Sequence, residues 1–406
     1  MNRLTYGYRT LRRTCRALPF MAARGAKPIS TLQASRSFPA LFVRGGTSNG
    51  LVIERKHLPP QDEWHTVLPA AMGAPDPYGR QLDGMGGGIS STSKVCVLEP
   101  STRPNADVDF TFIQVGIKDG VLDLAGNCGN MSSAVGPVAW DEGLVTDRAS
   151  KVQDVSGKSY QEALVRVFNT NTSKIIHSRF RVRGEPPVYC HEGDYEMDGV
   201  PGTQSQITLS FLDPAGAKTG RALPTGNPVD ALRLPDGSHI DASLVDVSNP
   251  GVFVRIDDLG IKDANPTTFN PQAIESDAGL KARLESIRRA GAAMMGLDPN
   301  TESVPKIVLL FSDSGSADVD IRCLALSMGQ AHKAVPLTLA LCLGAAANTP
   351  GTIPEQVRGT RGGSDAVVIG HPSGTVEIGA TIENGHIVSA ELLRTARVLM
   401  KGQVYY

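Results

Sequence analysis

Residues 126–136, GNCGNMSSAVG, place one cysteine, Cys128, between two Gly-Asn pairs and in front of a run of small residues. The small residues predict a helix that begins near Cys128. Because the free N–H groups and the positive dipole end of a helix lie at its N-terminus, an anion or a thiolate is stabilised there. Cys128 is therefore a candidate base or nucleophile, and Asn127 and Asn130 can cap the helix or bind a carboxylate. The alternative is a buried structural cysteine.

Residues 81–95, QLDGMGGGISSTSKV, combine glycines with hydroxyl groups and a lysine, namely Ser91, Thr92, Ser93 and Lys94. Glycines let the backbone approach a ligand closely, and the hydroxyls and the ammonium group donate to anionic oxygens. The order excludes a P-loop, in which the lysine precedes the hydroxyl residue, because here Ser93 precedes Lys94. A glycine-rich hairpin with solvated serines is the alternative reading of this stretch.

Residues 43–50, VRGGTSNG, form a third polar cluster. Arg44 can bind a carboxylate through two parallel hydrogen bonds, and Thr47 and Ser48 offer short polar contacts in a turn. The alternative is a hairpin turn that carries a surface arginine.

Three residues of the second half are weaker candidates for the same site. Asn249 belongs to the turn SNPGV, and His332 and Lys333 precede a second apolar segment. A histidine in such a place is more often a structural group than a catalyst.

The elements that would position these residues follow a repeated order. Short strand patterns dominate the first half, and residues 130–145 predict a small-residue helix packed deep within a sheet-lined domain. Residues 185–202 predict a linker or a long hairpin. The second half again contains strands, an amphipathic helix over residues 278–297 and a second small-residue helix over 329–347. We therefore expect two similar domains with a cleft between the helix tips, and a single domain is the alternative.

Composition excludes several functional classes. The chain has 406 residues, of which 41% are hydrophobic, and a formal net charge of −1. This charge gives no field that would attract nucleic acid or an anionic membrane, and the low aromatic content of 5% argues against base stacking. No apolar run is long enough to span a membrane. The six cysteines are scattered without a CxxC pair, which indicates a reducing compartment and no metal site. A homodimer is compatible with these features.

The first 38 residues differ from the rest of the chain. They contain arginines at positions 3, 9, 12, 13, 16, 24 and 36 but no acidic residue, since Glu54 is the first acid of the sequence. This pattern resembles a mitochondrial transit peptide, so a mitochondrial location is expected. The alternatives are a disordered basic tail and a start at Met21, with the protein in the cytoplasm.

Several segments together resemble the 2-methylaconitate cis-trans isomerase (PrpF) family, which has a diaminopimelate epimerase-like fold. They are RGGTSNG, QLDGMGGGISSTSK, GNCGNMSSAVGP, LDPAGAKTGRALPTG, SMGQAHKA and RTARVLMKGQVY. The resemblance extends from Arg44 to the C-terminus. It implies an α/β (α+β) fold of two similar domains, each a sheet wrapped around a central helix, with the active site in the cleft between them. The domains are expected at residues 39–202 and 203–394, and the tail at about 395–406 can return to the first.

The resemblance also assigns the site. The family's catalytic lysine falls on Lys94 and its catalytic cysteine on Cys128. Its substrates are small unsaturated di- or tricarboxylates, and it implies no metal and no organic cofactor. The turn at Asn249 is similar to an Asn-Pro turn that contacts the substrate in diaminopimelate epimerases. Substrate contacts are then expected at Arg44, Thr47, Ser48, Ser91, Thr92, Ser93, Asn127, Gly129, Asn130, Met131, Asn249 and Lys333.

Two positions depart from the pattern of relatives. The segment SMGQAHKA lacks the second cysteine that the epimerases carry at the other helix tip, so a racemisation that uses two thiols is not expected. Relatives often have an arginine where this chain has Lys333, and a lysine cannot form the bidentate contact.

The expected reaction begins with removal of an allylic proton by the Cys128 thiolate or by neutral Lys94. The resulting dienolate is stabilised by N–H donors and nearby cations, and its former double bond can rotate. Return of the proton to the same carbon gives cis-trans isomerisation, whereas return to another carbon shifts the double bond, as on an itaconate-, oxalomesaconate- or alkyl-aconitate-type acid. A carboxylate-binding accessory protein without catalysis is the alternative from another functional class.

Overall fold

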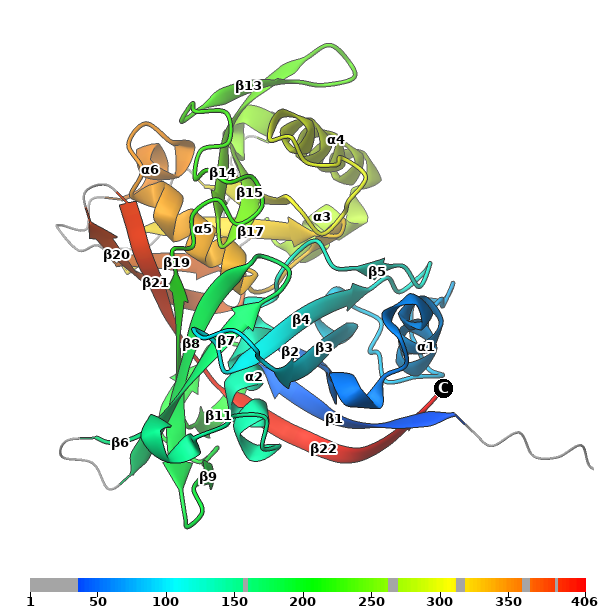
Figure 1. Ribbon diagram of the computed structural model, residues 1–406. Helices are drawn as coiled ribbons and strands as arrows, with labels where there is room; N and C mark the ends of the chain where they lie inside the picture. The colour runs from blue at the N-terminus through cyan, green and yellow to red at the C-terminus, as the bar shows by residue number, and fades with distance from the viewer. Residues whose placement is uncertain (1–35, 156–159, 262–268, 312–317, 360–365, 384–385) are drawn as a thin grey trace, which may run out of the picture. The chain divides into compact units, whose positions relative to one another are not determined.

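The fold is a mixed α/β arrangement in which strands wrap around two buried helices (Figure 1). The structure is a computed structural model that describes residues 36–155, 160–261, 269–311, 318–359, 366–383 and 386–406. No helix among these described residues is long and apolar enough to cross a membrane.

The N-terminal half, residues 37–204 together with 396–406, contains the first series of strands. Its ladder runs in the order β22, β1, β2, β3, β4, β7 and β8, in which β2–β3 and β4–β7 are parallel and the other pairs are antiparallel. These strands are β1 (Ser37–Gly45), β2 (Ser48–Glu54), β3 (Lys94–Pro100), β4 (Val108–Val115), β7 (Gln161–Asn169), β8 (Lys174–Arg183) and β22 (Ala396–Tyr405). Shorter strands are β5 (Leu122–Asp123), β6 (Val152–Asp154), β9 (Val188–Tyr189), β10 (Tyr195–Met197) and β11 (Val200–Gln204).

The C-terminal half, residues 213–394, contains a second ladder, and β12 joins it to the first by pairing with both β8 and β21. From β21 the order is β20, β19, β17, β16, β15, β14 and β13, in which β17–β19 and β15–β16 are parallel. The joining strand is β12 (Ile207–Leu212). The strands of the second ladder are β13 (Asp230–Arg233), β14 (His239–Val247), β15 (Asn249–Arg255), β16 (Lys306–Leu310), β17 (Ile321–Ser327), β18 (Gln330–Ala331), β19 (Val367–His371), β20 (Gly374–Glu383) and β21 (His386–Arg394).

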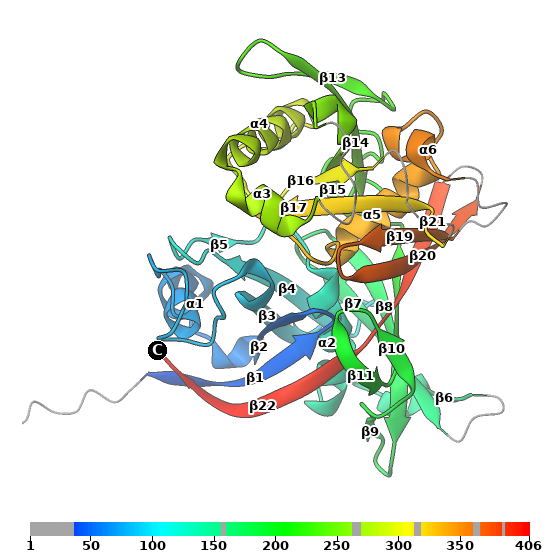
Figure 2. The ribbon, with the colours of Figure 1, turned by 180° about the vertical axis from the view of Figure 1, so that it is seen from behind.

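Each half wraps around one central helix. Helix α2 (Gly129–Asp141) lies within the first ladder and α5 (Leu337–Ala347) within the second, as Figures 1 and 2 show from opposite sides. Every residue of α5 and nearly every residue of α2 is buried, which explains why both sequences are small and apolar on all sides. The sheets bury alternate residues against these helices, because side chains of a strand alternate between its two faces.

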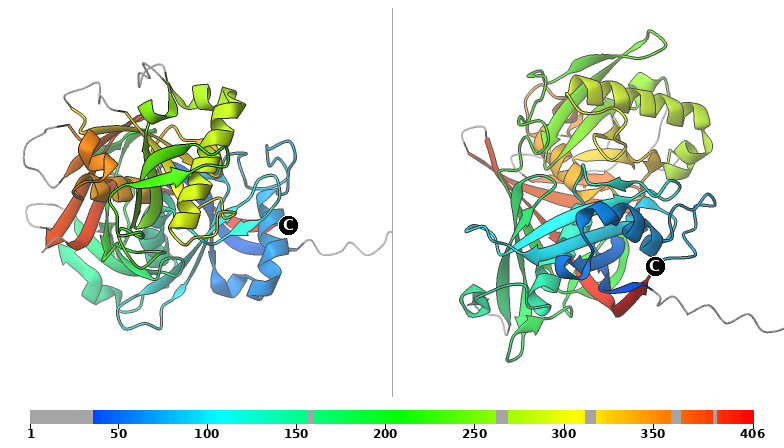
Figure 3. Two further views of the ribbon diagram at one scale, coloured as in Figure 1. Left: turned by 90° about the horizontal axis from the view of Figure 1, so that it is seen from above. Right: turned by 45° about the vertical axis from the view of Figure 1, so that its right-hand side comes forward.

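The opposite faces of the sheets are covered by other helices. Helix α1 (Trp64–Met72) packs on β1–β4, and α3 (Pro271–Ser276) and α4 (Ala278–Met294) pack on β13–β17. Figure 3 shows α1 and α4 on the outer side of their sheets. The short helix α6 (Ile353–Val357) follows α5 and packs against it. The outer faces of β1–β4 and β13–β17 are therefore covered, whereas β7, β8, β12 and β22 keep one face partly or fully exposed.

Most expected elements are present, with one correction. The amphipathic helix predicted at 278–297 is α4, and residues 185–202 contribute to the β10–β11 hairpin. The prediction of a helix over residues 329–347 is wrong in its first part, because β18 and a loop precede Pro336 and α5 begins only at Leu337. Proline lacks an N–H and fixes its own backbone, so it stands at the boundary of the helix. The predicted leader lies outside the described residues except for positions 36–38, and β1 already begins at Ser37.

Candidate active site

A cavity of about 410 Å³ lies where the N-terminal ends of α2 and α5 meet. The residues that line it come from both halves of the chain. They include residues 128–130 at the start of α2, residues 336–338 at the start of α5, and two lysines, Lys94 and Lys306. Two helix N-termini and two ammonium groups around one cavity favour an anionic ligand.

Cys128 is the N-cap residue of α2, and its extended backbone (φ −114°, ψ 99°) places it just before the first helical turn. It is partly exposed and lines the cavity. The other free cysteines of the described chain, Cys96, Cys190, Cys323 and Cys342, are buried. Burial raises the pKa of Cys96 and Cys342 and raises the pKa of Cys323 to about 12, so these thiols are inert. Among the five, Cys128 is the thiol in a position to react.

Lys94 is the first residue of β3 and is 7% exposed at the cavity wall. Its Nζ donates to Oε1 of Gln114 at 2.7 Å. The amide nitrogen of Gln114 donates in turn to the carbonyl oxygens of Ser90 (3.1 Å) and Ser93 (2.8 Å), which fixes Oε1 toward the lysine. Gln114 therefore orients Lys94, and nothing in the local sequence around Gln114 distinguishes it from other strand residues.

His332 lies in the same wall, where its Nε2 is 3.3 Å from the hydroxyl oxygen of Ser90. Burial, and then the charges of Lys94 and Lys306, lower the pKa of His332 to about 4. The imidazole is therefore neutral at physiological pH and can exchange a hydrogen bond with Ser90.

The structure brings many of the predicted residues to the cavity. Its lining contains Thr47, Ser48, Ser91, Lys94, Asn127, Cys128, Gly129, Asn130 and Lys333. It also contains residues that the sequence patterns did not single out, among them Gln114, Ser303 and Lys306. Lys306 and Ser303 come from a segment that showed only an ordinary strand pattern.

Five predicted substrate-binding residues do not line the cavity, and four of them have protein partners or core contacts instead. Arg44 donates to the carbonyl oxygens of Gly46 (2.8 Å) and Thr395 (3.1 Å) and to Oε1 of Gln204 (2.5 Å). The guanidinium group thus joins the β1–β2 turn to the chain before β22.

The remaining four residues are held away from the cavity in different ways. The Thr92 hydroxyl donates to Ile89 O at 3.1 Å, and the Ser93 hydroxyl donates to Val115 O at 2.9 Å. Met131 is fully buried among the core residues around α2. Asn249 is also fully buried, and neither its amide nitrogen nor its amide oxygen has a partner in the described structure.

The first two glycines of RGGTSNG, Gly45 and Gly46, are required by close packing on α2. A Cβ at Gly45 would lie 2.5 Å from Asn130 O, and a Cβ at Gly46 would lie 2.2 Å from Asn130 Oδ1. Gly46 also has a positive φ of 53°, which other residues rarely adopt. The amide nitrogen of Asn130 donates to the Thr47 hydroxyl at 3.1 Å. This turn therefore seats the start of α2 and carries Thr47 to the cavity.

The chain is similar to known proteins over nearly all of its described residues. A model of the family described as "PrpF protein" matches residues 36–406. The chain belongs to the PrpF family. PrpF relatives include a 3-methylitaconate isomerase of Eubacterium barkeri and a 2-methyl-aconitate isomerase of Cupriavidus necator. Each is 38% identical to this chain over 90% of it and 96% of the relative.

Solved structures give the same result for the fold. The crystal structure of a methylitaconate-delta-isomerase is 36% identical, covers 91% of this PrpF chain and 96% of its own, and has a TM-score of 0.69. A hydroxyproline epimerase from Agrobacterium vitis is 13% identical with a TM-score of 0.53, covers 92% of this chain and 94% of its own, and is similar in fold alone. The expectations of a PrpF-family isomerase with an epimerase-like fold of two sheet-wrapped helices are therefore confirmed.

The described part of the chain contains no group of three or more His, Cys, Asp or Glu side chains that could hold a metal ion. The cavity lining includes the thiol of Cys128, the amines of Lys94 and Lys306, the imidazole of His332 and several hydroxyls.

Proposed function

We propose that this PrpF-family isomerase interconverts the cis and trans forms of a small unsaturated tricarboxylate of the aconitate or 2-methylaconitate type. The observation that supports this most directly is that Lys94 and Cys128 line one cavity, which also receives the N-termini of α2 and α5. A proton-transfer pair at an anion-binding cavity is what allylic isomerisation of a carboxylate requires.

The proposed reaction transfers one proton away from carbon and back. Either the thiolate of Cys128 or the neutral amine of Lys94 removes an allylic proton. The C–H electron pair becomes a new double bond, and the former double bond becomes a single bond as charge moves onto the conjugated carboxylate. Rotation about that single bond followed by return of the proton to the same carbon gives the geometric isomer. The proton balance closes without an external oxidant or reductant.

The cavity offers groups that can stabilise the additional negative charge of the proposed dienolate. Free N–H groups at the starts of α2 and α5 point toward the cavity, and the hydroxyl of Thr338 beside the α5 tip donates to Asn127 O at 3.5 Å. Lys94 is held at the wall by Gln114 before substrate binds, so little reorganisation is needed during reaction.

The test is exchange of the allylic hydrogen with solvent. The wild-type protein should turn over at least one member of a panel of cis-aconitate, trans-aconitate and 2-methylaconitate, and proton NMR in D₂O should show deuterium at the allylic carbon. Cys128→Ala and Lys94→Ala should each abolish exchange, while Cys190→Ala, at a buried cysteine that does not line the cavity, serves as the matched control. If both site variants keep wild-type exchange, the mechanism is wrong.

A second candidate is a double-bond shift catalysed at the same site. The similarity to a methylitaconate-delta-isomerase over nearly the whole chain favours it. The two reactions share proton removal and differ only in the carbon that receives the proton. The same NMR experiment separates them when the substrate is 2-methylaconitate. A shift of its double bond away from the methyl-bearing carbon creates a vinylic proton, whereas its geometric isomer has none. Binding of an acid without any turnover, unaffected by Cys128→Ala, would instead indicate an accessory protein.

We also propose that residues 1–38 direct the protein to mitochondria. The segment is rich in arginine and free of acidic residues, and the family match begins only at residue 36. Fusion of residues 1–38 to a fluorescent protein should give mitochondrial fluorescence, and a fusion with glutamine at positions 9, 12 and 13 should lose it. A cytosolic wild-type fusion would overturn this assignment.

A further inference from the structure

The two halves of the fold place a lysine at the same point of their ladders. In the N-terminal half, the β1–β2 hairpin is followed by the parallel pair β2–β3, and β3 begins at Lys94. In the C-terminal half, the β14–β15 hairpin is followed by the parallel pair β15–β16, and β16 begins at Lys306. Lys306 is therefore the structural counterpart of Lys94.

The direction of the two side chains also matches. Cys96, two residues after Lys94, and Val308, two residues after Lys306, both belong to the core that surrounds α2 and α5. Because alternate residues of a strand share a face, both lysines point to the inner side of their sheets. Each is 7% exposed, and each lines the cavity.

Lys306 has little to neutralise its charge. Its Nζ donates to Ser303 O at 2.9 Å, and no carboxylate of the described residues forms an ion pair with it. A buried ammonium group without a counter-ion is costly, so an anionic ligand at this point is favoured.

Two unpaired polar side chains lie near Lys306, Ser303 in the cavity wall and Asn249 outside the cavity lining. The hydroxyl of Ser303 and the amide of Asn249 are buried without a partner in the described structure. Both surround Gly126, since a Cβ there would lie 3.6 Å from Ser303 Oγ and 3.7 Å from Asn249 Oδ1. Gly126 and Ser303 line the cavity. A carboxylate bound beside Lys306 would satisfy these buried donors and pair with the lysine.

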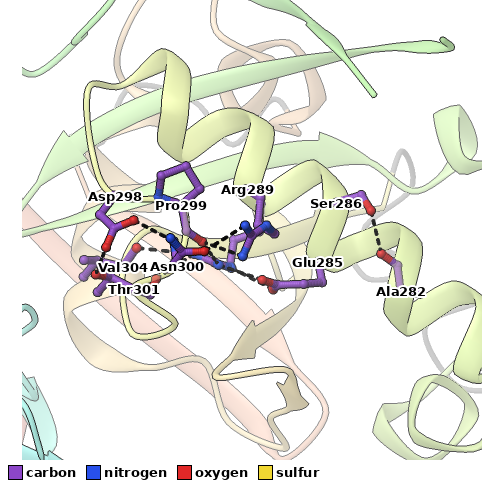
Figure 4. Close-up of polar contacts among 10 residues, drawn as sticks. Ala282, Glu285, Ser286, Arg289, Asp298, Pro299, Asn300, Thr301 and Val304 are labelled. Atoms are coloured by element: carbon purple, nitrogen blue, oxygen red, sulfur yellow. Dashed lines mark hydrogen bonds and ion pairs between the residues drawn. The ribbon is translucent and has the colours of Figure 1, made fainter. Parts of the chain in front are cut away.

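The segment that carries Ser303 and Lys306 is held in place by α4 (Figure 4). Arg288, only 2% exposed, donates to the carbonyl oxygens of Thr301 (2.9 Å) and Val304 (3.3 Å). Arg289 donates to Asn300 Oδ1 at 2.9 Å. The loop before β16 is thus fixed by its own charge-assisted hydrogen bonds, and the lysine that follows is positioned in advance.

We infer that Lys306, with the Ser303 hydroxyl beside it, binds a second carboxylate group of the substrate on the C-terminal wall of the cavity. The inference rests on the proposed function, because it assigns a contact within the same site. It implies that the substrate carries at least two carboxylates, one near Lys94 and Cys128 and another at Lys306.

Protonation offers an independent readout of this contact. Burial, and then the charge of Lys94, lower the pKa of Lys306 to about 8. The titratable groups that act on Lys306 are Lys94, Cys128, Asp123, Cys342 and His332. A carboxylate bound to Lys306 stabilises its charged form and raises its pKa, so binding takes up a proton near pH 8 and weakens as the pH rises above 8.

The experiment is isothermal titration calorimetry of the full chain with tricarballylate, a saturated tricarboxylate that cannot undergo the reaction. Titrations at pH 6 and pH 8 in buffers of different ionisation enthalpy give the Kd and the number of protons taken up. Lys306→Met should raise the Kd tenfold or more and remove the uptake at pH 8. Lys306→Arg should retain most of the affinity. Lys118→Met, at an exposed lysine outside the cavity, is the matched control and should leave both quantities unchanged.

The outcomes separate this inference from the proposed function. Wild-type turnover together with unchanged Kd and proton uptake in Lys306→Met would overturn the inference alone. Absence of both binding and turnover of every acid in the wild-type protein would instead overturn the proposed function. If thermal melting shows that Lys306→Met does not fold, the wild-type titrations decide: tight binding without proton uptake at pH 8 contradicts a carboxylate at Lys306.

Discussion

The contact between the tips of α2 and α5 depends on Gly129. A Cβ at this position would lie 2.9 Å from both Cβ and Cδ2 of Leu337, the first residue of α5. Real Cβ atoms do not approach so closely, so Gly129→Ala must move one helix tip away from the other. Gly129 does not have a positive φ, and alanine can adopt its backbone without strain. The substitution therefore tests packing at the site and not backbone conformation.

The magnitude follows from two opposing effects. Forcing a methyl group into a packed contact costs about 1–3 kcal/mol. Replacing glycine by alanine in a helix stabilises the folded state by about 0.5–1 kcal/mol. We expect a net loss of roughly 0.5–2 kcal/mol, which for a chain of this length lowers the Tm by about 1–3 °C. Because residues 128–130 and 336–338 line the cavity, displacement of the tips by part of an ångström should lower kcat by about tenfold or more.

The assays are thermal melting and steady-state kinetics on the substrate that the panel identifies. Gly402→Ala is the matched control, since a Cβ at Gly402 would meet nothing within 4 Å. Leu337→Ala removes Cδ2 from the contact, so Gly129→Ala should cost less in that background. If Gly129→Ala and Gly402→Ala show the same Tm and the same kcat, close approach of the helix tips does not set the site geometry.

Three further predictions concern single groups. Cys128 should react with a thiol reagent before the other described cysteines, which are buried, and bound tricarballylate should slow that reaction. Mass-spectrometric mapping of the modified cysteines checks this, and a buried cysteine that reacted first would contradict it. Burial lowers the pKa of His332 and of His371 to about 4, below the unfolded value, so the unfolded state binds more protons between about pH 6.5 and 4. Stability should therefore fall as the pH is lowered through that window, measured as the urea midpoint, and a flat profile would refute it. Trp140→Phe removes the hydrogen bond from the indole to Pro187 O at 2.9 Å. The free energy of unfolding in urea should fall by about 1–2 kcal/mol, and an unchanged urea midpoint would show that this bond does not contribute to stability.

Local patterns were sufficient for most of the fold. The period-2 alternation and the turn residues predicted the strands, and the all-round small residues predicted that α2 and α5 are central. The start of α5 was placed too early because small residues, Gly329, Ala331 and Ala334, also occur before Pro336. In the structure Gln330–Ala331 pair as β18 instead.

The candidate site was only partly readable from local sequence. Lys94 and Cys128 belong to unusual motifs, and the structure places both at the cavity. Arg44 belongs to an equally unusual motif, yet its donors are engaged by Gly46, Thr395 and Gln204. A motif shows that a residue has a specific partner, but it does not show whether that partner is a ligand or the protein itself.

The sequence by itself determined the residue types available for chemistry, the faces of the strands and the two buried helices, because these depend on neighbours within a few positions. Only the tertiary structure decided which polar groups meet. Gln114 reaches Lys94 across a strand pair, and Lys306 enters the cavity because the second half repeats the ladder of the first. These contacts depend on strand pairing and helix packing between distant segments, and no local pattern around Lys306 predicts them.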